Sequence, residues 1–223
     1  MVNGPIAGFV PAAMAGMLAS TRKSATKIGD CSRSGRHDEN GLVPVRLYRP
    51  IVSWVIAWRE TVTVCRLVAD DWQTYRAIRL AMLQESPSAF GGTHDVAAGN
   101  NERVWRQRLT GNVVLLARMG RTPAGSAMYS VFGASDPGDC SLFGMWVDPG
   151  FRRAGVGRIL VDSVLAQARA AGKRRVVLHV VADNTGAIGL YQRAGFVATG
   201  RSVPYPHDDR LTEIEMELVV EDG

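Results

Sequence analysis

The sequence predicts an α/β domain built on a mixed β-sheet, and three observations support this fold class. From Thr61 onward, segments with the alternation of strands and segments with the spacing of helices follow one another. Val176 to Val181 is almost continuously apolar, which is typical of a strand buried on both faces in a parallel pair. A helix predicted between this strand and the preceding one, Leu142 to Val147, supplies the crossover that a parallel pair requires.

The predicted domain begins with a strand and a helix. Val62 to Val68 has the alternation and the β-branched residues of a strand. Asp70 is expected to cap the helix that follows, with Gln73 completing a capping box. The helix is expected to end before Ser86-Pro87, because proline disfavours the helical conformation in the residue before it. The inward face of this helix is predicted to carry Trp72, Tyr75, Ile78 and Met82.

Apolar spacing, glycines and prolines delimit the remaining elements. In the last strand, apolar residues alternate with Glu213, Glu215 and Glu217, so one face is expected in the core and the other in water. In chain order we expect a loop at Ser88–Gly99, a helix at Asn101–Leu109, strands at Asn112–Met119, Ser126–Phe132 and Leu142–Val147, a helix at Ile159–Ala171, a strand at Val176–Val181, a helix at Ala187–Ala194 and a strand at Thr212–Val220.

Residues 1–60 differ from the rest of the chain because they lack a sustained period. Their positive charges follow the apolar run Ile6 to Ala19, whereas a signal peptide carries such charges before its apolar run. We therefore expect residues 1–60 to form a poorly ordered leader. An alternative within this expectation is that the gene start is placed too early and that residues 1–60 are not part of the native chain. Residues 61–223 are expected to form the folded domain.

Charge and composition exclude several function classes. The net charge is +5, but residues 1–60 contribute +4 of it (eight Lys/Arg against four Asp/Glu), so the domain is nearly neutral. A nearly neutral domain argues against a nucleic-acid partner. No apolar run approaches the ~20 residues of a membrane span, which argues against a membrane partner. The three cysteines are far apart and lack metal spacing, so we expect no metal, unpaired thiols and a cytoplasmic protein.

A basic Gly-x-Gly turn lies between the strand Leu142–Val147 and the next helix. Glycines let the backbone approach an anion closely, and the free N–H groups at a helix start bind phosphate. Arg152, Arg153 and Arg158 add positive charge to this turn. The segment does not match a Walker motif, because Gly157-Arg158-Ile159 replaces Gly-Lys-Ser/Thr. Gly-x-Gly before a helix also occurs as ordinary turn chemistry.

Two motifs in sequence order resemble those of the GNAT family of acetyl-CoA-dependent N-acetyltransferases. The first is Arg152-x-x-Gly155-x-Gly157, and the second is Asn184-x-x-Ala187-x-x-Leu190-Tyr191-x-x-x-Gly195-Phe196. The resemblance covers residues 61–223 and leaves the leader out. It implies the GNAT fold, a central mixed sheet of six to seven strands flanked by about four helices.

The resemblance also implies a site for acetyl-CoA as co-substrate. The turn would bind the pyrophosphate through backbone N–H groups, and a bulge in the preceding strand would expose backbone groups to the pantetheine arm and the acetyl group. Asn184 would bond the pantetheine chain, although Asn184 is also a natural cap for the next helix. The implied binding residues are Met145, Trp146, Val147, Arg152, Arg153, Ala154, Gly155, Val156, Gly157, Arg158, Asn184 and Tyr191.

The implied reaction is direct attack of an amine on the thioester through a tetrahedral intermediate. A tyrosine is protonated at neutral pH, so Tyr191 can give a proton to the leaving sulfur, which is the general-acid role in this family. The candidate bases are Glu85 and His179, with His207 and Asp208 as further options. A chain of waters without a dedicated base is an alternative, and His179 can also be a satisfied core histidine. Gly186 and Gly189 lie in the helix of Tyr191 and weaken it.

The sequence does not identify the amine that accepts the acetyl group. The loops Ser86–Gly99 and Val203–Arg210 are expected to shape its pocket. Their acidic residues favour a cationic primary amine of a small molecule or peptide, bound by a monomer or homodimer. The alternative function is a non-catalytic acetyl-CoA sensor with the same fold, and a nucleic-acid-directed role led by the basic leader is a third reading. These acidic residues are Glu85, Asp95, Asp208 and Asp209.

Overall fold

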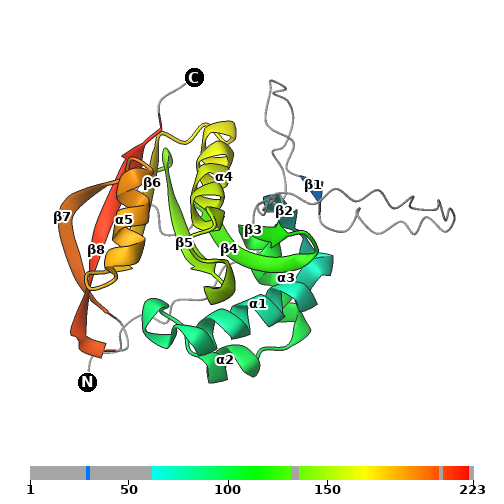
Figure 1. The fold of residues 1–223 in the computed structure, drawn as a ribbon. Coiled ribbons are helices and arrows are strands. Elements are labelled where there is room, and N and C mark those ends of the chain that lie inside the picture. The colour runs from blue at the N-terminus through cyan, green and yellow to red at the C-terminus, as the bar shows by residue number, and fades with distance from the viewer. Residues whose placement is uncertain (1–28, 31–61, 132–135, 206–207, 221–223) are drawn as a thin grey trace, which may run out of the picture.

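The computed structural model describes residues 29–30, 62–131, 136–205 and 208–220, and these form one sheet covered by helices (Figure 1). The strands are β1 Gly29–Asp30, β2 Val62–Leu67, β3 Val113–Met119, β4 Thr122–Ser130, β5 Asp139–Val147, β6 Arg175–Val181, β7 Val197–Tyr205 and β8 Asp208–Val219. The α-helices are α1 Trp72–Glu85, α2 His94–Ala98, α3 Glu102–Gly111, α4 Val156–Ala170 and α5 Thr185–Arg193.

The sheet is mixed, in the order β1-β2-β3-β4-β5-β6-β8-β7. Strands β2 to β5 form an antiparallel meander, and β8 lies antiparallel between β6 and β7. The parallel pair inside the sheet is β5 with β6, joined by α4. The predicted mixed sheet and its parallel pair are therefore confirmed, with β1 and β2 forming a second, two-residue parallel pair.

Two hydrophobic cores lie on opposite faces of the sheet. Helices α4 and α5 pack on one face, in a core that includes Leu160, Val164 and Phe196. Helices α1, α2 and α3 cover the other face, in a core built around Trp105. Strand β3 is buried on both faces, because Leu115 belongs to the first core and its neighbour Leu116 to the second. This arrangement has three layers, with the sheet between two groups of helices.

The start of α1 differs from its prediction. A 3₁₀ turn at Ala69–Asp71 precedes the helix, and Asp71 takes the N-cap position that was expected for Asp70. The Asp71 carboxylate accepts the Val68 N–H at 2.8 Å. Asp70 instead forms an ion pair with Arg106 of α3 at 2.6 Å, so a tertiary contact outweighs the local capping box. The predicted helix end before Ser86 is confirmed.

The sequence did not predict three elements, and it placed the starts of several others too late in the chain. Strand β1 lies in the predicted leader, helix α2 lies inside the expected loop Ser88–Gly99, and β7 lies where no element was expected. Strand β4 begins at Thr122, so the turn after β3 is shorter than predicted, and α4 begins at Val156 rather than Ile159. Most of the predicted leader, residue His207 and the end of the predicted strand Ser126–Phe132 lie outside the described residues.

The charged face of β8 is less exposed than predicted. Glu215 lies next to His179 and Arg201, and Glu217 pairs with Arg175 at 2.8 Å. The side chain of Glu215 is 15% exposed. The three glutamates of this face are partly buried rather than in water.

The Cys140 thiol should be unreactive toward alkylating reagents in the native protein. It is a fully buried free thiol, and burial raises its pKa to about 11, so the reactive thiolate is scarce at neutral pH. We expect no alkylation of Cys140 by iodoacetamide at pH 8 and complete alkylation after unfolding in guanidinium, both measured by peptide mass spectrometry. Rapid native labelling would contradict the buried position.

Cys65, in contrast, is disulfide-bonded, so the expectation of unpaired thiols is wrong for that residue.

Candidate functional site

The site lies where β5 and β6 separate. The two strands pair at only three positions, from Asp139 with Arg175 to Ser141 with Val177, and no register follows beyond them. Two cavities open along this gap, and both are lined by Met145, Asn184 and Tyr191. One cavity, of about 590 Å³, lies toward α1 and α3 and is called here the helix-side cavity. The other, of about 1080 Å³, reaches the basic Gly-x-Gly turn and is called the turn-side cavity.

The expected bulge in β5 is present. Ser126 pairs with Trp146 and Met128 with Phe143, so β5 has one residue more than β4 between these pairs. Gly144 has φ +59° at this point, a conformation that favours glycine. Beyond the bulge, Asp148 donates its N–H to Ala124 on β4 at 3.0 Å. The alternation of an antiparallel ladder therefore directs the Val147 N–H away from β4 and toward the gap.

The turn after β5 presents backbone N–H groups to the turn-side cavity. Arg153 and Gly155 have φ of +66° and +86°, and α4 begins at Val156. The first hydrogen bond of α4 runs from the Ile159 N–H to Gly155, which leaves the preceding N–H groups of the helix start without an intrahelical acceptor. A Cβ on Gly157 would lie 3.1 Å from Leu190 and 3.5 Å from Met145. The absence of a side chain there keeps the cavity floor open.

The arginines of the turn are held in different ways. Arg152 donates to the Val147 carbonyl at 3.0 Å and pairs with Glu85 at 2.8 Å. Arg158 pairs with Asp162 and donates to the Arg193 carbonyl at 2.7 Å, so it joins α4 to α5. Arg153 also lines the turn-side cavity, so the turn offers an anion the Arg153 guanidinium together with backbone groups.

Glu85 is a fixed carboxylate at the end of α1. Its Oε2 accepts hydrogen bonds from Trp146 at 3.0 Å, from Arg152 and from the Ser86 hydroxyl. Burial would raise the pKa of Glu85, but these hydrogen bonds outweigh burial and lower the pKa. The carboxylate thus ties α1 to the bulged strand and to the turn, and the turn-side cavity lies beside it.

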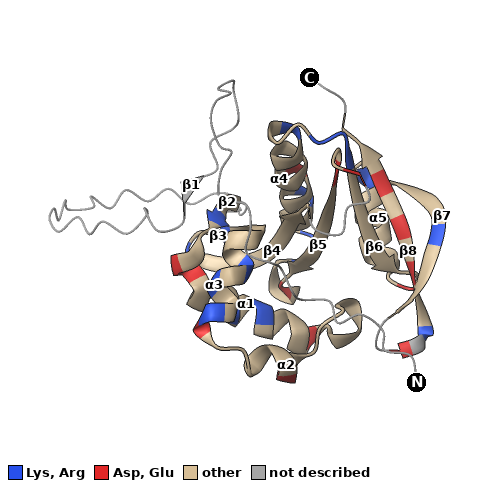
Figure 2. Ribbon diagram, turned by 180° about the vertical axis from the view of Figure 1, so that it is seen from behind, with Lys and Arg blue, Asp and Glu red and all other residues tan. Residues whose placement is uncertain are grey.

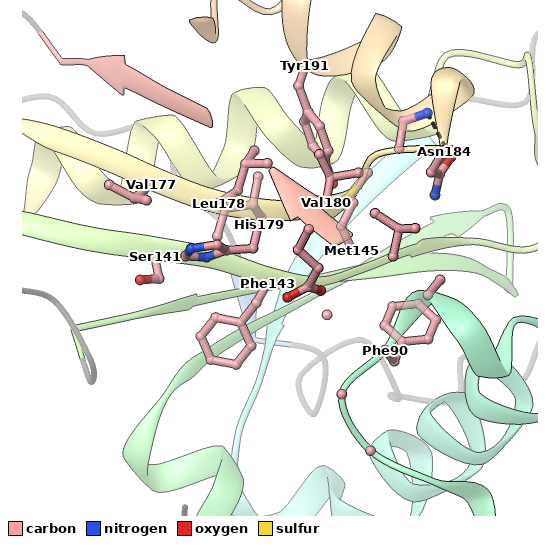
Figure 3. A pocket seen from close by; sticks show the side chains of 18 of the residues that line it. Phe90, Ser141, Phe143, Met145, Val177, Leu178, His179, Val180, Asn184 and Tyr191 are labelled. Atoms are coloured by element: carbon pink, nitrogen blue, oxygen red, sulfur yellow. Dashed lines mark hydrogen bonds between the residues drawn. The ribbon is translucent and has the colours of Figure 1, made fainter. Parts of the chain in front are cut away.

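Asn184 and Tyr191 enter the site from α5. Asn184 is the N-cap residue of α5, and its side chain accepts the Ala187 N–H at 3.1 Å, so the capping role is confirmed. Tyr191 is 6% exposed and packs edge-on against Phe196. Burial raises the pKa of Tyr191, which keeps its hydroxyl protonated across the neutral range. Figure 3 shows Tyr191 pointing toward Val180 and Met145 in the gap, with the Asn184 capping bond dashed.

His179 lies in the helix-side cavity and is not a core residue. Its side chain is 43% exposed, and its Nε2 lies 3.7 Å from the Glu215 carboxylate. Of the other candidate bases, Asp208 is paired with Arg210, and hydrogen bonds from Arg210 lower its pKa to about 2. Of the acidic residues expected to shape the acceptor pocket, Glu85 lines the turn-side cavity, whereas Asp208 and the exposed Asp95 line neither cavity.

Four cavity residues were not identified from the sequence. Arg79 of α1, Arg108 of α3, Phe90 and Glu213 of β8 line the helix-side cavity, which also receives Gly91 and Gly92 from the predicted pocket loop. From the second predicted pocket loop, Tyr205 donates its hydroxyl to the Phe90 carbonyl at 2.7 Å. The helical spacing of Arg79 from Tyr75 and Met82 was the only signal, and an arginine that faces solvent at the edge of an apolar stripe would show the same spacing.

The described residues contain no cluster of three or more metal-ligating side chains. Within the same residues, no helix has the length and apolarity of a membrane span.

Comparison with known sequences identifies the family. The sequence model of the acetyltransferase (GNAT) family matches residues 78–196. The chain is 37% identical over 78 residues to the ribosomal protein bS18-alanine N-acetyltransferase of Salmonella typhimurium, covering 33% of this chain and 53% of that protein. It is 44% identical over 55 residues to a mycothiol acetyltransferase of Geodermatophilus obscurus, covering 25% of this chain and 18% of that protein. The chain thus spans about half or less of these curated relatives.

Solved structures share the fold. A GNAT-family acetyltransferase from Streptococcus pneumoniae matches with a TM-score of 0.62 at 19% identity, covering 72% of this chain and all of that one. A Salmonella typhimurium protein solved with its cofactor acetyl-CoA matches with a TM-score of 0.60 at 21% identity, covering 73% of this chain and 96% of that one. The bulge, the glycine turn and the capping asparagine lie within the region that the family model matches. Because that match spans more than half of its residues, the chain belongs to the acetyltransferase (GNAT) family.

Proposed function

We propose that this protein is an N-acetyltransferase that moves the acetyl group of acetyl-CoA to a primary amine of a small molecule or peptide. The observation that carries the proposal is the gap between β5 and β6, along which the two cavities share Met145, Asn184 and Tyr191. This arrangement lets the two substrates approach one point from different cavities. Direct attack of the amine on the thioester requires such a meeting point.

The turn-side cavity has the features that acetyl-CoA requires. The free N–H groups at the start of α4 fit a pyrophosphate, and the open floor at Gly157 admits a slender chain. The bulge at Gly144 frees backbone groups of Met145 and Val147 for a pantetheine amide and the acetyl oxygen. Acetyl-CoA, once bound, supplies an activated acyl group as a thioester.

The residues of this chain would then have three roles. The Val147 N–H, directed into the gap, donates to the acetyl oxygen as negative charge develops on it in the tetrahedral intermediate, an effect usually worth several kcal/mol. Tyr191 gives a proton to the departing sulfur. Glu85 positions the turn through Arg152 and Trp146.

The test of this function is thiol release from acetyl-CoA across a panel of primary amines. Amine-dependent release of coenzyme A is the expected result. Binding of acetyl-CoA in calorimetry without release for any amine would favour the alternative, an acetyl-CoA sensor.

For the base, we propose His179 rather than Glu85. His179 lines the helix-side cavity, whereas the Glu85 carboxylate is already engaged by three donors. His179→Gln should lower kcat/KM for the amine by roughly 10²-fold. The measurement is kcat/KM for the amine, with Glu85→Gln as the comparison. A kcat/KM that is unchanged in His179→Gln and falls in Glu85→Gln would reverse the assignment.

A further inference from the structure

The helix-side cavity has walls of opposite character. Arg79 and Arg108 come from α1 and α3, which lie together on one face of the sheet and carry the basic residues seen there in Figure 2. His179 and Glu213 come from β6 and β8 across the cavity. Because Glu213 pairs in register with Val181, and Glu215 with His179, the side chains of Glu213 and His179 lie on the same face of the sheet. The cavity therefore has a cationic helical wall and a second wall with a carboxylate.

The Arg79 side chain is partly buried at the wall of the helix-side cavity. Its Nε is buried and has no hydrogen-bond partner, and among the described residues no carboxylate pairs with Arg79 or Arg108. Its guanidinium lies over the Phe90 ring at 5.5 Å and donates only to the Met82 sulfur at 3.5 Å. A buried charge without a counter-charge is costly for a folded protein.

The two guanidinium groups also repel each other. Burial, together with the neighbouring charge of Arg108, lowers the pKa of Arg79. Burial raises the pKa of Tyr75, and the charges of both arginines oppose that rise. A ligand oxyanion would reduce the repulsion between the two arginines near the buried Tyr75 hydroxyl, because guanidinium groups bind oxyanions with paired hydrogen bonds.

Arg79 lies beside the bulge of β5 and beside the loop before α2. Its Nη1 lies 3.9 Å from where a Cβ of Gly144 would be, at the bulge, and its Nη2 lies 3.3 Å from the same point on Gly92. Both glycines leave room beside the guanidinium. The cavity volume of about 590 Å³ suits a small molecule.

We infer that the acceptor is a small amine that also carries an anionic group, a carboxylate or a phosphonate, bound by Arg79 and Arg108, with its amino group directed to His179 and Glu213. This inference rests on the proposed function. In the reaction, the new N–C bond replaces the C–S bond that breaks. The amine loses one proton and the sulfur gains one, so atoms and charge balance.

The first test compares matched acceptors on the wild-type protein. L-amino acids are compared with their α-amides, and aminoalkylphosphonates with uncharged alkylamines of the same length. We expect the anionic member of one pair type to have a kcat/KM on the order of 100-fold higher, because an unpaired buried group penalises the neutral analogue. A higher kcat/KM for amino acids than for their amides would indicate a carboxylate, and a higher kcat/KM for aminoalkylphosphonates than for alkylamines would indicate a phosphonate. Equal rates within both pair types would overturn the inference and leave the acetyltransferase function standing.

A binding test does not depend on turnover. Product-like N-acetyl-amino acids and N-acetyl-aminoalkylphosphonates are expected to raise the melting temperature of the wild-type protein, whereas N-acetyl-amino amides and N-acetylalkylamines are not. If no amine is acetylated but one of the anionic probes binds, the proposed function fails and the anion site stands. If neither anionic probe raises the melting temperature, the anion site is wrong.

Variants separate recognition from folding. Arg79→Met and Arg108→Gln should each raise the KM of the preferred anionic acceptor by about 10- to 100-fold and leave the Kd of acetyl-CoA unchanged. Arg103→Gln, an exposed position on α3, is the control and should match wild type. Because Arg79→Met removes an uncompensated charge, its melting temperature should be no lower than that of wild type, but anionic probes should no longer raise it. A lower melting temperature with an unchanged KM would show that Arg79 only stabilises the fold.

Discussion

Tyr191→Phe should lower kcat by roughly 10²- to 10⁴-fold, because it removes the hydroxyl proposed to protonate the departing sulfur. Tyr191 lines both cavities where they meet, and it is 6% exposed, so no bulk water replaces the lost donor easily. The Kd of acetyl-CoA should change little, since the proposed pyrophosphate contacts are backbone groups of the turn. The measurement is steady-state thiol release, with the Kd from calorimetry.

The pH dependence of the wild-type enzyme provides a second check on Tyr191. A general acid acts only while it is protonated, and burial raises the pKa of Tyr191 above the usual value near ~10. Activity should therefore not decline through tyrosine ionisation below about pH 10.

Tyr129→Phe is the matched control for this substitution. Tyr129 is 7% exposed in the same hydrophobic core as Tyr191 but lines neither cavity, and burial raises its pKa to about 12. It should keep wild-type turnover. If Tyr191→Phe also turned over at the wild-type rate, the proton would have to come from solvent or from another group.

The sequence predicted the parts of the site that depend on local geometry. A glycine turn before a helix and an asparagine N-cap depend on the backbone of a few neighbouring residues, which the sequence shows directly. Gly155 and Asn184 accordingly lie at the starts of α4 and α5. A bulge in the strand before the turn was an expectation from the family resemblance, and the structure has one between Phe143 and Trp146. Strand β7 was missed because nearly all of it is exposed and its register with β8 shifts between Ala198 and Ser202, which removes the alternation of a strand.

The helix-side cavity had no local signal, because its walls come from elements that are far apart in the sequence. In the sequence, Arg79 and Arg108 were indistinguishable from solvent-facing charges of amphipathic helices, and Glu213 from a residue on the solvent-facing side of a strand. Only the tertiary fold brings Arg79 and Arg108 to the same cavity as Glu213.

Asp139→Ala should cause the largest loss of stability among the single changes considered. Asp139 and Arg175 face each other at the first pair of the short β5–β6 ladder, joined by two hydrogen bonds of 2.5 and 3.1 Å. The Asp139 side chain is 8% exposed, and Arg175 is 29% exposed. Removing one partner of a buried ion pair costs about 3–5 kcal/mol. Because Arg175 is partly exposed and keeps its 2.8 Å bond to Glu217, we expect about 3 kcal/mol, a fall in Tm of about 6–12 °C.

The control for Asp139 is Glu102→Ala, which removes an exposed ion pair to Arg106 on the surface of α3 and should cost no more than about 1 kcal/mol. Both variants are measured by thermal and urea unfolding. The difference in stability between the two variants bears on the site, because β5 and β6 are paired at only three positions before they separate around the gap. A loss from Asp139→Ala no larger than that of Glu102→Ala would mean that the packing of α4 against the sheet, rather than this ion pair, holds the two strands together below the gap.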